Sequence, residues 1–176
     1  LRFQRLDLFT VTLRQIGSYI ARTQLEDAVK VLIDGDGNKN PAAVINAATP
    51  DALTYSDLIS LWSAFEEYQM NTLLVSPAMM QKMLNLEEFK APQNGLDFLT
   101  TGKLSTPFGA QIFRSSAVPD DKIIGFDKRC ALELVQAGEI QVDYDKLIDR
   151  QLERAAITCT AGFAKIFADA VKVLEL

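Results

Sequence analysis

The residues GAQIFRSSAVPDDKIIGFDKRCA (109–131) and RAAITCTAGFAKIF (154–167) dominate the last third of the chain, which is rich in β-forming residues. Short apolar runs bounded by Pro, Gly and Asp are typical of strands joined by turns. The pattern predicts strands over 110–113, 123–126, 131–135, 140–144 and 156–163, with a helix at 144–154 between the last two.

A long amphipathic helix is predicted near the start of the chain. From Leu6 to Ile33 the apolar residues recur mostly three, four or seven positions apart, and no Pro interrupts them. At about 1.5 Å per residue this helix would extend roughly 40 Å, with a bend near Gly17–Ser18. The Gly- and Asn-rich run Asp34–Pro41 predicts the turn that ends it, and 41–50 reads as a loop.

Two further helices have start signals. Thr54 and Asp57 match the acidic form of a capping box, and one apolar helical face follows, made of Leu58, Leu61, Trp62 and Phe65. Ser76 and Pro77 match an N-cap followed by Pro at the first helical position, directly after an apolar strand at 72–75. The stripe Met79, Met80, Met83, Leu84 and Leu86 behind them is typical of a packed core. Residues 85–106 read as loops. A leading helix, a mixed middle and a β-rich end together predict an α+β fold class.

Composition bounds the possible functions. The 176 residues, 48% hydrophobic and 23% charged, suffice for one sizeable core or two small ones. A net charge of −5 without clustered Lys and Arg argues against nucleic-acid binding, and no run approaches the ~20 apolar residues that cross a membrane. The sequence begins at Leu1 without a secretion signal, so we expect a soluble chain that is processed or part of something longer.

Residues for catalysis or metal binding are scarce. The chain has no His, which excludes Ser-His-Asp and Cys-His arrangements and His-ligated metals. Cys130 and Cys159 form no CxxC pair, and we expect buried free thiols in a reducing cytoplasm.

Two motifs resemble binding loops but lack essential positions. Asp34, Asp36 and Asn38 occupy the first ligand positions of a calcium loop, yet Lys39 and Ile45 stand where that loop needs Gly and Glu, so a plain turn is predicted. Gly102–Lys103 lacks the earlier Gly and the following Ser or Thr of a phosphate-binding loop, because Asp97 and Leu104 stand there.

Acidic residues occur in pairs that read as solvated surface charges: Glu66–Glu67, Glu87–Glu88 and Asp120–Asp121. A further group lies at helical spacing and predicts an exposed face able to pair with a neighbouring subunit: Asp145, Asp149, Arg150, Glu153 and Arg154. We therefore predict no catalytic, cofactor-binding or metal-binding residue, and a structural role.

The order of these elements resembles the tailed-phage major capsid protein family of the Hong Kong 97 fold. Residues 6–33 look like its spine helix and 54–68 like its first axial helix, while 71–80 are similar to its strand followed by a Pro-started helix. Gly125-Phe126-Asp127 stands where the family usually carries Gly-Asp-Phe, and 150–167 resemble its peripheral strands. The resemblance implies a peripheral spine at 1–40, an axial domain at 41–135 and a return to the peripheral domain at 136–176.

The resemblance also implies a function. The chain would be a shell subunit of a phage or prophage head, found in the virion, made in the bacterial cytoplasm and partnered by copies of itself in pentamers and hexamers. It would lack the N-terminal arm and extended loop of a full subunit, so alone we expect a monomer or small oligomer. Crosslinking through a late Asn is not implied, because no Asn follows Asn94. The alternatives are an encapsulin-like compartment shell and, more distantly, a small α+β enzyme using paired carboxylates.

Overall fold

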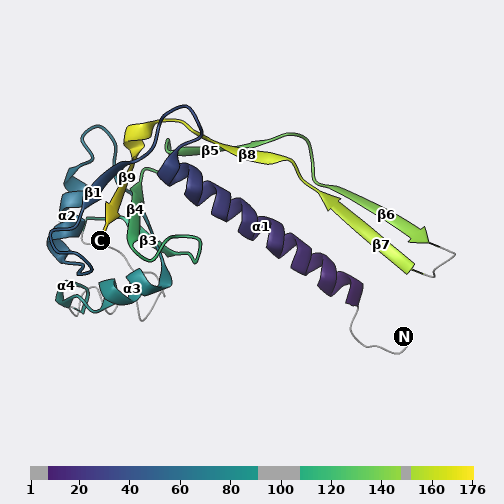
Figure 1. The fold of residues 1–176 in the computed structure, drawn as a ribbon, viewed down its shortest axis with the longest axis horizontal. Coiled ribbons are helices and arrows are strands. Elements are labelled where there is room, and N and C mark those ends of the chain that lie inside the picture. The colour runs from purple at the N-terminus through teal and green to yellow at the C-terminus, as the bar shows by residue number, and fades with distance from the viewer. Residues whose placement is uncertain (1–7, 91–107, 148–151) are drawn as a thin grey trace.

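The computed structural model describes residues 8–90, 108–147 and 152–176. A compact body carries a long helix and a long β-ribbon that extend away from it on the same side (Figure 1). The helix, α1 (Leu8–Asp34), has 27 residues and confirms the predicted spine. It is continuous through Gly17 and Ser18, without a break at the expected bend.

The end of α1 is set by a glycine. Gly35 has a φ of +86°, a left-handed conformation that glycine adopts without strain, and its amide donates to the Val31 carbonyl at 2.9 Å. A Cβ at this position would lie 2.9 Å from the Asn40 backbone. The Asn40 side-chain oxygen accepts from the Asp36 amide at 3.1 Å, so this segment forms the predicted turn.

A five-stranded sheet forms the centre of the body, in the order β1, β9, β4, β2, β3. The strands are β1 (Ala43–Asn46), β9 (Val171–Glu175), β4 (Lys122–Phe126), β2 (Thr72–Val75) and β3 (Gln111–Arg114). β1 is parallel to β9 and β2 to β3, whereas the other neighbours are antiparallel. Three of these strands are confirmed predictions, but the expected loop over 41–50 contains β1, and β9 has no counterpart among the predicted elements.

The sheet separates two apolar cores because its side chains alternate between its faces. Leu73 and Val75 of β2 pack into one core, and Leu74 between them packs into the other. The first core is covered by α2 (Tyr55–Ser63), α3 (Pro77–Leu84) and α4 (Glu87–Lys90). Val29 and Leu32 of α1 belong to the second core, so the spine is anchored to the opposite face.

The capping predictions for the short helices are confirmed. Thr54 caps α2 with a complete capping box to Asp57, and Ser76 caps α3 with Pro77 in the first turn. Met79 and Met83 are fully buried, as expected of a core stripe. The face predicted for α2 is only partly right, because Leu58 and Leu61 are buried, Trp62 is 48% exposed, and the helix ends before Phe65.

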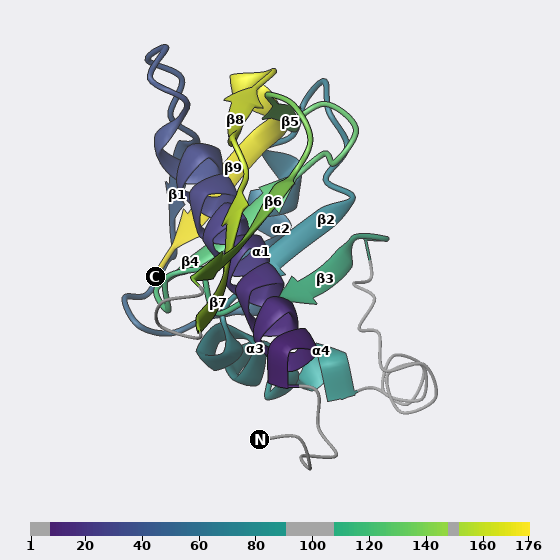
Figure 2. The same cartoon turned by 90° about the vertical axis from the view of Figure 1, so that its right-hand side faces the viewer.

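The ribbon consists of two antiparallel pairs joined end to end. Its strands are β5 (Leu132–Gln136) with β8 (Ala161–Lys165), and β6 (Gln141–Leu147) with β7 (Leu152–Thr158). The ribbon runs above α1, and its β6–β7 end points away from the body (Figures 1 and 2). The strand predicted over 156–163 is therefore divided between β7 and β8.

The predicted helix at 144–154 is wrong in the described residues, because 144–147 belong to β6 and 152–154 belong to β7. Asp145 and Arg154 are ion-paired at 2.8 Å across the two strands and do not lie along one helical face. Val142 lies opposite Ile157 in the hairpin, so the alternation of apolar residues, which has the period of a strand, decides the structure. Asp149 and Arg150 of the predicted face lie outside the described residues.

The strand pairing does not follow the last predicted domain boundary, between residues 135 and 136. β5 spans that boundary and pairs with β8, and β9 returns to the central sheet between β1 and β4. Residues 171–175 therefore share a sheet with strands of the range assigned to the axial domain. The three-domain division itself stays a prediction.

Candidate functional site

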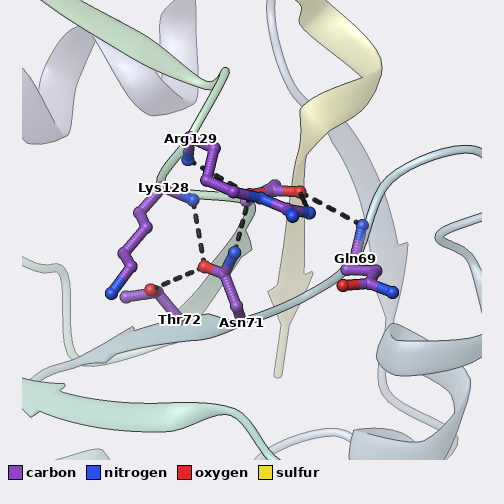
Figure 3. Close-up of polar contacts among 6 residues, drawn as sticks. Gln69, Asn71, Thr72, Lys128 and Arg129 are labelled. Carbon is purple, nitrogen blue, oxygen red and sulfur yellow. Dashed lines mark hydrogen bonds and ion pairs between the residues drawn. The ribbon is translucent and has the colours of Figure 1, made fainter.

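The most highly connected polar side chain in the described chain is Asp127, at the end of β4, where the chain leaves the central sheet toward the ribbon. Its side chain is almost fully buried, and the Arg129 guanidinium contacts both carboxylate oxygens, Nε at 3.0 Å and Nη2 at 2.7 Å. The carboxylate also accepts from the Asn71 side chain at 2.6 Å, from the Gln69 amide at 3.3 Å and from the Arg129 amide at 3.1 Å. Figure 3 shows these groups converging from two segments distant in sequence.

Asn71 extends this cluster on the side of β2. Its side-chain oxygen accepts from the Lys128 amide at 3.0 Å and from the Thr72 hydroxyl at 2.9 Å (Figure 3). The Asp127 amide donates to the Ala170 carbonyl at 3.0 Å, just before β9. The cluster therefore ties together the start of β2, the end of β4 and the approach to β9.

The electrostatics of the cluster suit a permanent anion. The hydrogen bonds from the Arg129 guanidinium hold the pKa of Asp127 well below its ordinary value, against the opposing effect of burial, and the bonds from Asn71 and Gln69 act in the same direction. A general acid or base needs a pKa near the working pH. This carboxylate stays ionised and fully bonded, so the arrangement fixes the chain path and offers no acid–base chemistry.

A second polar contact holds α1 against the ribbon. Lys165 of β8 is 5% exposed, and its ammonium donates to the Leu32 carbonyl at 3.0 Å, in the last turn of the helix. Its amide donates to the Asp36 carboxylate at 3.1 Å. Burial lowers the pKa of Lys165, and the nearby Asp36 carboxylate opposes this effect. The ammonium also provides a partner for the Leu32 carbonyl, one of the last carbonyls of α1, which have no partner within the helix.

The acidic residues singled out in the sequence do not converge on a buried site. Glu66, Glu67, Glu87, Glu88, Asp120 and Asp121 are all exposed. Glu66 and Glu67 line a hollow of about 260 Å³ with Asp169 and Lys172, but exposed carboxylates lack the desolvation that adapts such groups to acid catalysis. No cluster of metal-ligating side chains occurs among residues 8–90, 108–147 and 152–176. Gly102 and Lys103 lie outside these ranges.

The cysteines differ from expectation in one respect. Both are free thiols, as predicted, but each is partly exposed. Cys130 lies in the turn after Asp127, where burial raises the pKa of its thiol, and Cys159 accepts from the Gln24 side chain at 3.6 Å.

An aromatic hollow of about 620 Å³ lies near the Asp127 cluster. Trp62 stacks on Phe108 with ring centroids 6.4 Å apart, and Phe65 and Asn71 also line the hollow. Sequence reasoning missed both this hollow and the Asp127 cluster, because each depends on residues that only the tertiary fold brings together.

No helix in the described part of the chain is long and apolar enough to span a membrane.

Comparison with known proteins gives a family. A family model described as "Phage capsid protein" matches residues 1–172. No curated protein matches the sequence.

Solved structures similar in fold include the capsid of a GTA particle, a phage and an encapsulin complex. The capsid of an empty GTA particle has a TM-score of 0.74 at 14% identity, covering 99% of this chain and 68% of its own. Mycobacterium phage Che8 has a TM-score of 0.73 at 16% identity, covering 93% and 61%. The holo-SrpI encapsulin complex from Synechococcus elongatus has a TM-score of 0.69 at 16% identity, covering 99% and 68%. The chain thus spans about two thirds of the length of these proteins.

These likenesses confirm the α+β fold of the Hong Kong 97 type that the resemblance implied. The family match extends over nearly the whole sequence. The chain therefore belongs to the phage capsid protein family.

Proposed function

We propose that the chain is a structural shell subunit of a phage or prophage capsid, which assembles with copies of itself into an icosahedral head. The observation that carries the proposal is the family match over residues 1–172. The spine helix and projecting ribbon support it, because extended elements of this kind reach beyond the body of one subunit (Figure 1). In such a shell the copies form pentamers and hexamers, closed rings built from repeated contacts between unlike surfaces.

The role we propose is non-enzymatic and independent of cofactors. The polar clusters at Asp127 and Lys165 support this view, because their charged groups are used in contacts that fix the chain path. The subunit would reside in the virion after synthesis in the bacterial cytoplasm. On their own, the 176 residues would form monomers or small oligomers.

The test is assembly of the complete gene product that contains this chain. After expression in bacteria, sedimentation and electron microscopy of the lysate should show closed particles of uniform size. Mass spectrometry of purified phage particles should find peptides of this chain at the copy number of a major component. A complete product that stays dispersed at high concentration, or that is absent from virions, would contradict the proposal.

An encapsulin-like compartment is the second candidate, favoured by the similarity to the encapsulin structure. The contents of the particles separate the two roles. Particles filled with DNA support the phage head, whereas DNA-free particles enclosing a protein cargo support the compartment.

A further inference from the structure

An apolar groove lies between α1 and the central sheet, on the face of the sheet that carries the second core. It has a volume of about 490 Å³, within the range of small binding sites. Leu25 and Ala28 line it from the helix, Leu74 and Phe126 from β2 and β4, and Phe113 from the edge strand β3. Leu25 is 43% exposed and Phe113 is 51% exposed, so this apolar surface is open to solvent.

Two cations flank this groove. Arg114 and Lys128 are both exposed and both line it, and neither has an ion-pair partner among the described residues. Lys128 binds Asn71 only through its backbone amide, so its ammonium stays free of the Asp127 cluster (Figure 3). Among the described residues, no Asp or Glu lines the groove. The chemistry that fits it is an apolar anchor flanked by carboxylates.

The chain itself carries a segment of that chemistry on the projecting ribbon. Residues 139–145 hold three carboxylates and no Lys or Arg, and Asp145 is already paired with Arg154 of β7, which leaves Glu139 and Asp143 for a partner. Within this segment, Ile140, Val142 and Tyr144 alternate with polar residues and are 54%, 42% and 64% exposed. A two-stranded hairpin with no further strand beside it is marginally stable in water, so covering its apolar face would stabilise it.

We propose that the groove is the docking site for residues 139–145 of a second copy of the chain. The β6–β7 hairpin points away from the body that contains the groove, so it reaches a neighbour and not its own groove (Figure 1). In this contact the strand face that carries Val142 and Tyr144 covers the apolar floor. Asp143 points to the other face of the strand, so its carboxylate meets the long Arg114 or Lys128 side chain at the rim of the groove, as does Glu139, which precedes β6.

The contact joins two unlike surfaces, so a pair of copies keeps one free groove and one free hairpin for further neighbours. Charge complementarity would favour this pairing over a contact between two grooves or two hairpins. The inference rests on the proposed shell function and identifies one contact that such a shell would use.

The test uses variants that disable one surface at a time. In the groove variant, Arg114→Glu is combined with Lys128→Glu, which repels an acidic partner. In the hairpin variant, Val142→Ser is combined with Tyr144→Ser, which removes the apolar anchors. A matched control combines Lys39→Glu with Lys90→Glu, an identical change in net charge at exposed sites outside the groove.

Self-association is measured by analytical ultracentrifugation, with circular dichroism to verify folding. The wild-type chain and the control should associate with the same affinity, and the groove variant should associate about tenfold more weakly or worse. An equimolar mixture of groove and hairpin variants should form a dimer that grows no further. In that dimer the hairpin of the groove variant occupies the groove of the hairpin variant, and the two remaining surfaces are disabled. A milder double variant of the hairpin, Glu139→Gln with Asp143→Asn, should also weaken association. It replaces the Val142→Ser/Tyr144→Ser variant if that variant misfolds.

Three results would overturn the proposal: a wild-type chain that stays monomeric at millimolar concentration, a groove variant that associates like the control, or a mixture that forms no dimer. The same substitutions in the complete gene product separate this inference from the shell role. If the groove variant assembles normally, the shell function stands and the docking site is wrong. If the wild-type product forms no particles, the shell function itself is wrong.

Discussion

Replacing Asp127 by Ala should lower the free energy of unfolding by about 2–3 kcal/mol. The substitution removes the acceptor of the Asn71 side chain and of the Gln69 amide, two donors that are partly buried in the fold. Leaving such a donor without a partner costs about 1–3 kcal/mol. The Arg129 side chain is 63% exposed, so its guanidinium returns to water and adds little to the loss.

The measurement is urea unfolding followed by circular dichroism, with thermal unfolding alongside. For a chain of this size the loss corresponds to a decrease in Tm of about 4–12 °C. Asp121→Ala is the matched control, because this carboxylate is 52% exposed and lies 3.9 Å from the Lys122 ammonium. Such surface pairs contribute about 0–1 kcal/mol. An Asp127→Ala variant that unfolds at the same urea concentration as the control would refute the structural role of the cluster.

The same carboxylate predicts how stability depends on pH. Its pKa in the folded state is lower than the ordinary value of 3.8, so the unfolded chain takes up the proton first. The contribution of Asp127 is therefore complete above the ordinary value and declines as the pH falls below it toward the folded-state pKa. The isosteric variant Asp127→Asn should lose less stability than the wild type over that acidic range. An equal loss in both would show that other carboxyls dominate acid unfolding.

Three further substitutions test other contacts by urea unfolding. Lys165→Ala should cost about 1–3 kcal/mol, because the Leu32 carbonyl loses its buried donor, and unchanged stability would contradict the link between α1 and β8. Thr54→Ala should cost about 1 kcal/mol through the loss of the α2 cap, and a neutral result would count against the cap. Gly125→Ala should cost about 1–3 kcal/mol, because the new Cβ would lie 2.8 Å from the Met70 sulfur; a stabilised variant would show that Met70 moves aside freely.

The sequence suffices to predict elements whose signals are local. The cap of α2 depends on Thr54 and Asp57, three residues apart, and the start of α3 depends on Ser76 and Pro77. The spine helix is predictable for a similar reason, because its apolar positions repeat with the helical period over 27 residues.

Elements whose signals are ambiguous or distant are predicted poorly. The spacing of Asp145, Asp149 and Glu153 suits a helix, whereas Val142 and Tyr144, just before them, alternate as in a strand. The cross-strand pairing of β6 with β7 decides in favour of the strand. β1 has only four residues and pairs with β9, whose residues lie far along the chain, so neither segment shows its partner locally.

The Asp127 cluster shows why polar sites are the hardest to predict. Its members come from the start of β2 and from the turn after β4, separated by more than fifty residues. Arg129 follows Asp127 closely in sequence, but Gln69 and Asn71 do not. Only the antiparallel pairing of β2 with β4 brings Asn71 next to Asp127.

The position of β9 imposes an order on folding during synthesis. Although it is the last strand among the described residues, it occupies an interior place in the sheet, between β1 and β4. A ribosome that has completed β4 has therefore released β1 without its neighbour, and the sheet closes only after residues 171–175 emerge. Native pairing between positions such as Ala43 and Lys172 spans most of the chain, and long-range pairing of this kind is slow. A growing chain would thus complete the sheet only after β9 emerges, and a subunit interrupted before β9 would leave β1 and β4 without the strand that joins them.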